Sequence, residues 1–137
     1  MRSRRARIGW TLTILLAAGA AGAAAYAEYR ADRQQLERQA EAMTGGSVER
    51  GKAAFARYGC GSCHSASGVP QASGKVGPPM TGIAGRAIIG GRLDNRPDNL
   101  RRWIEDPQGV SPGTAMPDLG VTPADSRDIA AFLYTQS

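Results

Sequence analysis

The sequence of 137 residues is poor in aromatic side chains, in cysteine and in histidine. Phe, Trp and Tyr make up 6% of the residues, whereas glycine occurs 18 times, and there are only two Cys and one His. A small domain with so few large apolar side chains buries a thin core. A zinc site needs four ligands, so two Cys and one His would have to be completed by carboxylates, which argues against a zinc-binding domain.

The chain also lacks a strongly charged domain. Its formal net charge is +5, but the arginines at positions 2, 4, 5 and 7 account for four of these charges. Residues 28–46 carry a net charge of −1, and residues 47–137 carry only +2. Binding to nucleic acid normally requires a basic stripe or patch. The composition therefore argues against a nucleic-acid partner.

The most informative motif is Cys60-Gly61-Ser62-Cys63-His64. This C-x-x-C-H pattern is the one that attaches haem covalently. On one short helical turn, Cys60 and Cys63 can each form a thioether to a vinyl group while His64 points its imidazole at the iron. We predict one covalent haem c, whose porphyrin supplies the missing apolar core. A structural disulfide or a thioredoxin-like dithiol is the alternative, but a redox dithiol needs no following histidine.

The N-terminal segment has the pattern of an exported protein. No charged residue occurs from Ile8 to Ala27, and four arginines precede this stretch. About 20 apolar residues suffice to cross roughly 30 Å of hydrocarbon as a helix, and the arginines favour a cytoplasmic N-terminus. We predict a single-pass anchor in the inner membrane at residues 1–27, with the haem domain in the periplasm. The small residues Ala25 and Ala27 before Glu28 support the alternative, a signal peptide cleaved to leave a soluble periplasmic protein.

Residues 28–46 are predicted to form a polar helical stalk that ends in a linker. The segment is rich in helix formers, and its large apolar residues, Tyr29, Leu36 and Met43, are too widely spaced to build a core alone. As a helix it would be a spacer of about 24 Å, from a rise of about 1.5 Å per residue. An exposed N-terminal helix on a soluble protein is the alternative. Gly45-Gly46 is interpreted as a flexible joint before a domain at residues 47–137.

Three helices are expected in that domain, each with an apolar face and a recognisable start. They run from Val48 to Tyr58 after the N-cap Ser47, from Pro97 to a stop at Pro107, and onward from Pro123 after the N-cap Thr122. The intervening segments are rich in Gly, Pro and Ser and are predicted as loops around the porphyrin, without any strand. The expected fold class is all-α.

Together with the haem motif, two loop sequences carry a resemblance to a known family. Gly77-Pro78-x-Met80-x-Gly82-x-x-Gly85-Arg86 and Pro112-Gly113-Thr114-Ala115-Met116-Pro117 resemble the two haem-facing loops of bacterial class I mono-haem c-type cytochromes. The resemblance covers residues 47–136. It implies the cytochrome c fold, three main helices and loops wrapped around one covalent haem c, here preceded by an N-terminal transmembrane or signal helix.

The second axial ligand of the iron is predicted to be Met116. The chain has no second histidine, so the sixth ligand is a Met, a Lys or nothing. Met80 is close in sequence to His64 and lies in the loop that the resemblance places on the proximal side. Met116 is far enough along the chain to reach the opposite face. A Met/His pair raises the reduction potential relative to two nitrogen ligands.

The resemblance also implies roles for residues around the haem. The carbonyl of Pro78 would accept the second N–H of His64, Arg86 and Thr114 would lie near a propionate, and Trp103 would cover the ring close to the methionine sulfur. Plainer roles are a solvated arginine, a turn threonine and a core tryptophan. Gly51 and Phe55 would form the contact between the first and last helices, where a missing side chain permits close approach.

These expectations lead to an electron carrier rather than an enzyme. An iron with both axial positions filled can change charge but offers no site to a substrate. The predicted partners are membrane redox complexes of the quinol-cytochrome c reductase and terminal oxidase types, as donor and acceptor. The alternatives are a fixed haem subunit of a terminal oxidase or nitric oxide reductase, and a five-coordinate ligand-binding or peroxidase-like haem if Met116 does not ligate.

Overall fold

The computed structural model describes the backbone of residues 2–136 and the side chains of residues 10–136. The chain divides into two compact units, the first ending at Gln35 and the second beginning at Leu36. We describe each unit by itself. The side chains of Arg2, Arg4, Arg5 and Arg7, on which the predicted membrane orientation depends, lie outside the described residues.

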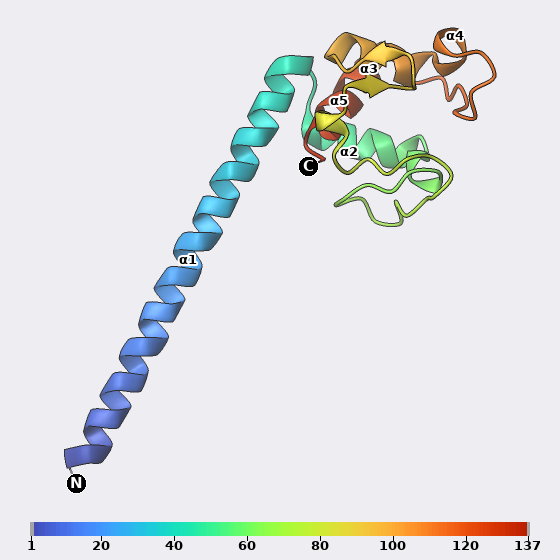
Figure 1. Ribbon diagram of the computed structural model, residues 1–137. Coiled ribbons are helices and arrows are strands. Elements are labelled where there is room, and N and C mark those ends of the chain that lie inside the picture. The colour runs from blue at the N-terminus through green and yellow to red at the C-terminus, as the bar shows by residue number, and fades with distance from the viewer. Residues whose placement is uncertain (1, 137) are drawn as a thin grey trace. The chain divides into compact units, whose positions relative to one another are not determined.

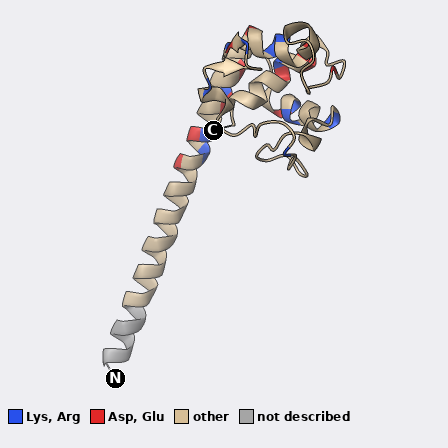
Figure 2. Ribbon diagram, turned by 45° about the vertical axis from the view of Figure 1, so that its right-hand side comes forward, with Lys and Arg blue, Asp and Glu red and all other residues tan. Residues whose placement is uncertain are grey.

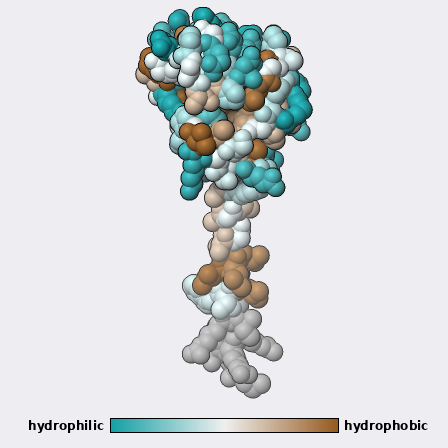
Figure 3. Space-filling model, turned by 90° about the vertical axis from the view of Figure 1, so that its right-hand side faces the viewer, coloured by the Kyte–Doolittle hydropathy of each residue, from teal (hydrophilic) through white to brown (hydrophobic). Residues whose placement is uncertain are grey.

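Helix α1 runs from Arg2 to Thr44 (Figure 1); its residues as far as Gln35 form the first unit, and the later ones belong to the second. The described part of its apolar stretch carries no acidic or basic residue before Glu28 (Figure 2). Large side chains exposed on it include Trp10, Leu15 and Leu16, and Figure 3 shows strongly hydrophobic residues on the surface of this helix. By length and composition the helix can cross a membrane, a test that a signal sequence near the N-terminus also passes.

The second unit contains the three predicted helices and several shorter elements. The main helices are α2 (Val48–Arg57), α3 (Pro97–Glu105) and α5 (Pro123–Tyr134). The shorter elements are two 3-10 turns, η1 (Cys60–Ser62) and η2 (Ile83–Gly85), strands β1 (Ile88–Ile89) and β2 (Leu93–Asp94), and helix α4 (Pro107–Val110). The helical fold class is confirmed.

Capping explains where two of the main helices begin. The Ser47 hydroxyl accepts a hydrogen bond from the N–H of Arg50, and the Thr122 hydroxyl accepts one from the N–H of Asp125. Such bonds satisfy N–H groups that have no partner within the helix. Helix α3 begins instead at Pro97, after an Arg96 whose side chain makes no capping bond. Proline at the first position suits a helix start because its ring fixes φ and its missing N–H needs no partner.

Two expectations about the segments between the helices were wrong. Strands β1 and β2 form a short antiparallel ribbon, with Ile89 opposite Leu93, where no strand was expected. Gly90 and Gly91 turn the chain with positive φ angles of 56° and 71°, which glycine adopts without strain. The second error concerns Pro107, which ends α3 but also begins α4. The Asp106 carboxylate caps that helix by accepting from the N–H of Gly109 at 2.7 Å.

The core is centred on α5, which contacts α2 and α3. Where α2 crosses α5, a Cβ atom added to Gly51 would lie 1.8 Å from the carbonyl oxygen of Asp128. The backbones can meet there only because position 51 has no side chain. Next to this contact, the rings of Phe55 and Phe132 pack edge to face with centroids 5.6 Å apart. The helix contact implied by the resemblance is therefore present.

The last turns of α1 belong to the second unit instead of a free stalk. Ala40 is 1% exposed and lies in the core, whereas Met43 is 55% exposed. A Cβ atom on Gly46 would lie 2.2 Å from the carbonyl oxygen of Arg127. Gly46 thus serves a close backbone approach, in contrast to the flexible joint that the glycine pair suggested. Small residues make this contact, so a search for large apolar residues does not detect it.

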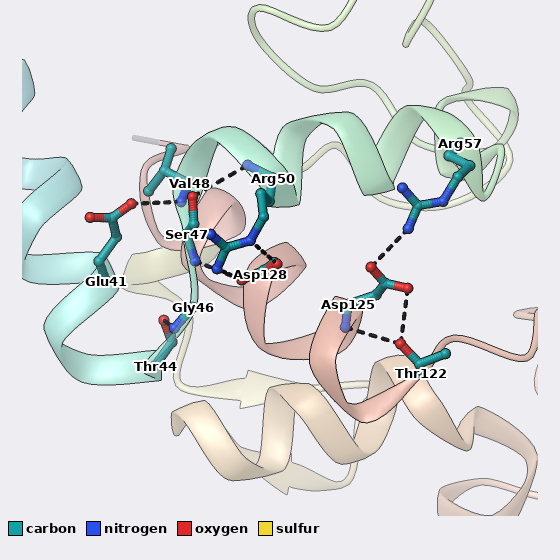
Figure 4. Close-up of polar contacts among 10 residues, drawn as sticks. All are labelled: Glu41, Thr44, Gly46, Ser47, Val48, Arg50, Arg57, Thr122, Asp125 and Asp128. Atoms are coloured by element: carbon teal, nitrogen blue, oxygen red, sulfur yellow. Dashed lines mark hydrogen bonds and ion pairs between the residues drawn. The ribbon is translucent and has the colours of Figure 1, made fainter.

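Polar contacts hold the same junction together (Figure 4). The Asp128 carboxylate accepts hydrogen bonds from the N–H of Ser47 at 2.7 Å and from the Arg50 guanidinium at 2.8 and 3.0 Å. Glu41 accepts from the N–H of Val48 at 2.9 Å. The hydrogen bonds from Arg50 lower the pKa of Asp128 more than its burial raises it. The end of α1, the start of α2 and α5 are joined by charge-assisted bonds.

Candidate functional site

The C-x-x-C-H motif occupies one tight turn directly after α2. Gly59 adopts a positive φ of 71° and redirects the chain into η1. The carbonyl oxygen of Cys60 accepts hydrogen bonds from the N–H groups of Cys63, at 3.3 Å, and of His64, at 3.0 Å. Both cysteines are half-buried. The turn therefore gathers two thiols and an imidazole within five residues.

The structure also describes the surroundings of the two thiols. Both are free and not joined in a disulfide. Burial raises the pKa of the Cys60 thiol, whereas a reactive dithiol requires a lowered pKa. Within the part of the chain that the structure describes, no three His, Cys, Asp or Glu side chains lie together as a metal site would require.

The His64 imidazole is held on one side by a backbone carbonyl. Its Nδ1 lies 2.8 Å from the carbonyl oxygen of Pro78, which can only accept. Nδ1 therefore donates, and in the neutral ring Nε2 keeps a free lone pair for a metal. Gly77 lies directly against the ring, because a Cβ atom there would be 2.2 Å from Cε1 and 2.5 Å from Nδ1. These two contacts fix the orientation of the ring.

The loop that carries Pro78 is tied to the motif by two further backbone bonds. The N–H of Gly77 donates to the carbonyl of Cys63 at 2.9 Å, and the N–H of Met80 donates to the carbonyl of Ser65 at 2.8 Å. The Met80 side chain is 6% exposed and lies in the core. The Arg86 guanidinium donates to the carbonyls of Pro79 and Thr81 in the same loop. The structure thus places Arg86 on the proximal loop.

A second loop carries Thr114 and Met116. The N–H of Thr114 donates to the carbonyl of Ser111 at 3.0 Å, and the N–H of Met116 reaches the Thr114 hydroxyl at 3.5 Å. Both residues are half-buried. In the described part of the chain, no hydrogen bond joins this loop to His64, Pro78 or Arg86.

Comparison with known proteins identifies the family. The cytochrome c family model matches residues 48–137. The chain belongs to the cytochrome c family. With its single C-x-x-C-H motif, it is a class I mono-haem c-type cytochrome, and its prosthetic group is one covalent haem c. Cys60 and Cys63 have the spacing that forms the two thioethers.

Three relatives show the range of proteins that contain this cytochrome c domain. The chain is 33% identical over 90 residues to cytochrome c oxidase subunit 2 of Alkalihalophilus pseudofirmus, and the match covers 66% of this chain and 25% of the oxidase subunit. It is 36% identical over 107 residues to a cytochrome c homolog of Bradyrhizobium diazoefficiens, covering 66% and 55% of the two chains. It is 31% identical over 110 residues to cytochrome c2 of Agrobacterium tumefaciens, covering 67% and 95%.

The coverage of these relatives differs greatly. The chain spans about a quarter of the oxidase subunit and about half of the cytochrome c homolog, but nearly all of the cytochrome c2. No solved structure matches this cytochrome c.

The residues around the motif fit a haem c. When bound, the haem supplies a metal that changes charge by one electron. His64 offers an unshared lone pair, Gly77 leaves room for its ring, and Cys60 and Cys63 are unpaired thiols on the same turn. These are the groups that covalent attachment and axial ligation require.

Trp103 lies on α3 with its ring partly buried against the core. A Cβ atom on Gly90, in the turn between β1 and β2, would lie 2.7 Å from the six-membered part of the indole. The ribbon that the sequence did not reveal therefore packs on this tryptophan. This position is consistent with the plainer reading, a core residue, and its role near a methionine sulfur stays a prediction.

Two amide side chains that organise the site were missed from the sequence. Asn95 donates to the carbonyls of Ile83 and Arg86, at 2.7 and 2.8 Å, and accepts from the Tyr134 hydroxyl at 2.9 Å. Gln108 binds the loop of Met116. Burial raises the pKa of Tyr134, so its hydroxyl stays a donor. The only signal in the sequence is an amide residue beside a Gly/Pro-rich loop.

Proposed function

We propose that this cytochrome c transfers single electrons through a haem whose iron is bound by His64 and Met116. The observation that carries the proposal is the His64 side chain, whose Nδ1 is engaged by the Pro78 carbonyl so that Nε2 is left for iron. A carbonyl partner for the second nitrogen is the usual support of a metal-bound histidine, because it fixes the ring and raises its basicity.

Met116 is the best candidate for the opposite ligand. Met43 is exposed on α1. Met80 is buried and tied through its N–H to Ser65, next to the proximal histidine. Met116 is half-buried on a separate loop that makes no hydrogen bond to the His64 side in the described residues. A neutral thioether favours ferrous iron and raises the potential.

The ligand assignment is tested by Met116→Ala with Met80→Ala as its matched control. We expect Met116→Ala to lower the reduction potential and to let carbon monoxide bind the ferrous form readily. We expect Met80→Ala to keep both properties and to lose about 2–5 kcal/mol of stability, the usual cost of truncating a buried methionine. The opposite pattern would show that Met80 is the ligand. Binding of carbon monoxide by the unmutated protein would favour a five-coordinate haem.

We further propose that residues 1–27 remain as a membrane anchor with the haem domain in the periplasm. Apolar side chains exposed on α1 support this, because exposed apolar surface of that extent needs a covering medium. An anchored carrier gains effective concentration near membrane partners and does not require a strongly charged docking face, in agreement with the small net charge of residues 47–137.

The membrane proposal is tested by the intact mass of the haem-bearing protein. We expect a species that retains its N-terminus and is recovered in the membrane fraction. A soluble periplasmic species that begins at Glu28 would show instead that the segment is a cleaved signal peptide.

Respiratory complexes of the quinol-cytochrome c reductase and terminal oxidase types are the proposed donor and acceptor. Two of the relatives are named cytochrome c oxidase subunit 2, which also favours a second candidate, a fixed haem subunit of an oxidase. The match to a cytochrome c2, which covers 95% of the length of that cytochrome c2, supports a separate carrier. Purification from detergent-solubilised membranes distinguishes the two, since a fixed subunit co-purifies in constant ratio with its complex.

A further inference from the structure

Gln108 binds the loop of Met116 at three points. Its side-chain nitrogen Nε2 donates to the carbonyl oxygens of Thr114, at 2.9 Å, and of Met116, at 2.8 Å. Its oxygen Oε1 accepts from the N–H of Gly113 at 3.2 Å. Both donor hydrogens and the acceptor of the amide are therefore used on one short loop.

Helix α4 gives this side chain a fixed base. Pro107 is fully buried at the start of the helix. The carboxylate of Asp106 caps the N–H of Gly109, and the N–H of Ser111 donates to the carbonyl of Pro107 at 2.9 Å. Gln108 itself is half-buried between these contacts. A side chain on such a base can determine the position of the loop that it binds.

The loop has little else to hold it at Met116. In the described part of the chain, Met116 makes one other hydrogen bond, from its N–H to the Thr114 hydroxyl at 3.5 Å, which is at the limit for such a bond. Gly113 adopts a positive φ of 83°, and residues 117–120 are exposed. The hydrogen bond from Gln108 to the Met116 carbonyl, at 2.8 Å, is shorter than this one. It holds the backbone of the residue whose sulfur is proposed to bind iron.

We propose that Gln108 is a positioning residue that orders the backbone of Met116 for binding to the haem iron. The inference rests on the proposed function, in which Met116 is the distal ligand. A methionine side chain has three rotatable bonds and is easily displaced from one geometry. When its backbone is already ordered, less conformational entropy is lost as the sulfur binds. Gln108 supplies that order without touching the metal.

Two substitutions separate positioning from packing. Gln108→Glu has nearly the same shape and keeps the acceptor for the N–H of Gly113, but it turns carboxylate oxygens toward two carbonyl oxygens in place of the donors. Gln108→Met has similar length, with neither hydrogen bonds nor charge. If Gln108 only fills space, the Glu variant is the milder of the two. If it positions Met116, the Glu variant is the more severe, because it repels the carbonyls that the amide attracted.

The experiment uses the full-length, haem-loaded protein in detergent. Carbon monoxide is the probe, and the rate at which it binds the ferrous form reports how often the sixth position is open. Loss of two hydrogen bonds of ordinary strength should raise that rate roughly tenfold in Gln108→Met, and repulsion between the carboxylate and the two carbonyl oxygens should raise it further in Gln108→Glu. Both variants should also lower the reduction potential and weaken the absorption band of the methionine-iron bond in the ferric protein. Arg102→Gln, on the exposed side of α3, is the control and should change none of these.

Met116→Ala, measured in parallel, distinguishes failure of the inference from failure of the proposed function. If Met116→Ala opens the sixth position but both Gln108 variants retain slow carbon monoxide binding and an unchanged potential, Gln108 does not position Met116. A Glu variant milder than the Met variant would likewise overturn the inference in favour of packing. If Met116→Ala leaves the sixth position closed, the ligand assignment is wrong and the inference is overturned with it.

Discussion

Adding one methyl group at Gly77 should displace the proximal histidine. In Gly77→Ala the new Cβ atom would lie 2.2 Å from Cε1 and 2.8 Å from Nε2 of His64. Non-bonded carbon atoms in contact are about 3.5–4.0 Å apart, so the ring and the loop have to separate by more than about 1 Å. His64 has little freedom to withdraw, because it directly follows Cys63, which is attached to the haem.

The cost of this displacement has two parts. Overpacking of an ordered contact typically costs about 1–3 kcal/mol. Separation by this amount also breaks the 2.8 Å hydrogen bond between His64 and Pro78, a loss of about 0.5–1.5 kcal/mol. Without that bond the imidazole is less basic and donates less to the metal. The ferric state then loses more stabilisation than the ferrous state, so we expect a higher reduction potential together with lower stability.

Denaturant unfolding and redox titration of the haem-loaded protein test these two effects. Gly85→Ala is the matched control, because a Cβ atom at that glycine meets no atom within 4 Å and should leave both quantities near those of the unmutated protein. The reasoning is refuted if Gly77→Ala has the midpoint of unfolding and the potential of the control. A lower stability with an unchanged potential would retain the steric argument but refute the role of the Pro78 carbonyl.

Two further predictions concern the contact between α2 and α5. Gly51→Ala should lose about 1–3 kcal/mol of stability or more, since its Cβ would lie 1.8 Å from the carbonyl oxygen of Asp128. This loss exceeds the gain of up to about 1 kcal/mol in helix propensity. Denaturant unfolding measures it with Gly85→Ala as the control, and unchanged or higher stability would contradict it. Because Arg50 lowers the pKa of Asp128, the ion pair stabilises the fold above the ordinary pKa of about 3.9 and is lost as the pH falls through the lowered value. Asp128→Asn should therefore lose stability near neutral pH and show a shallower acid decline than the unmutated protein. Asp98→Asn is the control, because its side chain is 93% exposed and its pair with Arg101 at 3.3 Å lies on the surface, where such pairs contribute little; it should follow the unmutated curve closely.

Helices were predictable here wherever a cap or a proline marked their start. Ser47, Pro97 and Thr122 each stand at the position where a main helix begins. The ribbon at residues 88–94 was not predictable, because two-residue strands have no measurable alternation of polar and apolar side chains. What forms it is a turn at Gly90 and Gly91 and the packing of that turn on Trp103, a contact between residues distant in sequence.

The candidate site, too, has a part that was predictable from the sequence and a part that was not. The motif at Cys60–His64 was predictable because covalent attachment demands a fixed local spacing. The Pro78 carbonyl that orients His64 was expected only from the family resemblance, because any residue type provides a carbonyl and no local pattern singles one out. Asn95 and Gln108 were missed for the converse reason: an amide side chain is common in loops, and only the folded structure shows which carbonyls it binds.

The junction at Gly46 changes where an anchored haem domain could gain its mobility. A flexible joint requires backbone that is free of tertiary contacts. Here Gly46 lies against the backbone of Arg127, Ala40 is in the core, and Ser47 is bound to Asp128. Gly46 is thus packed inside the folded unit, and the last turns of α1 belong to that unit. If the chain is anchored, the Gly45-Gly46 pair is therefore not the hinge that lets the haem domain meet its donor and acceptor.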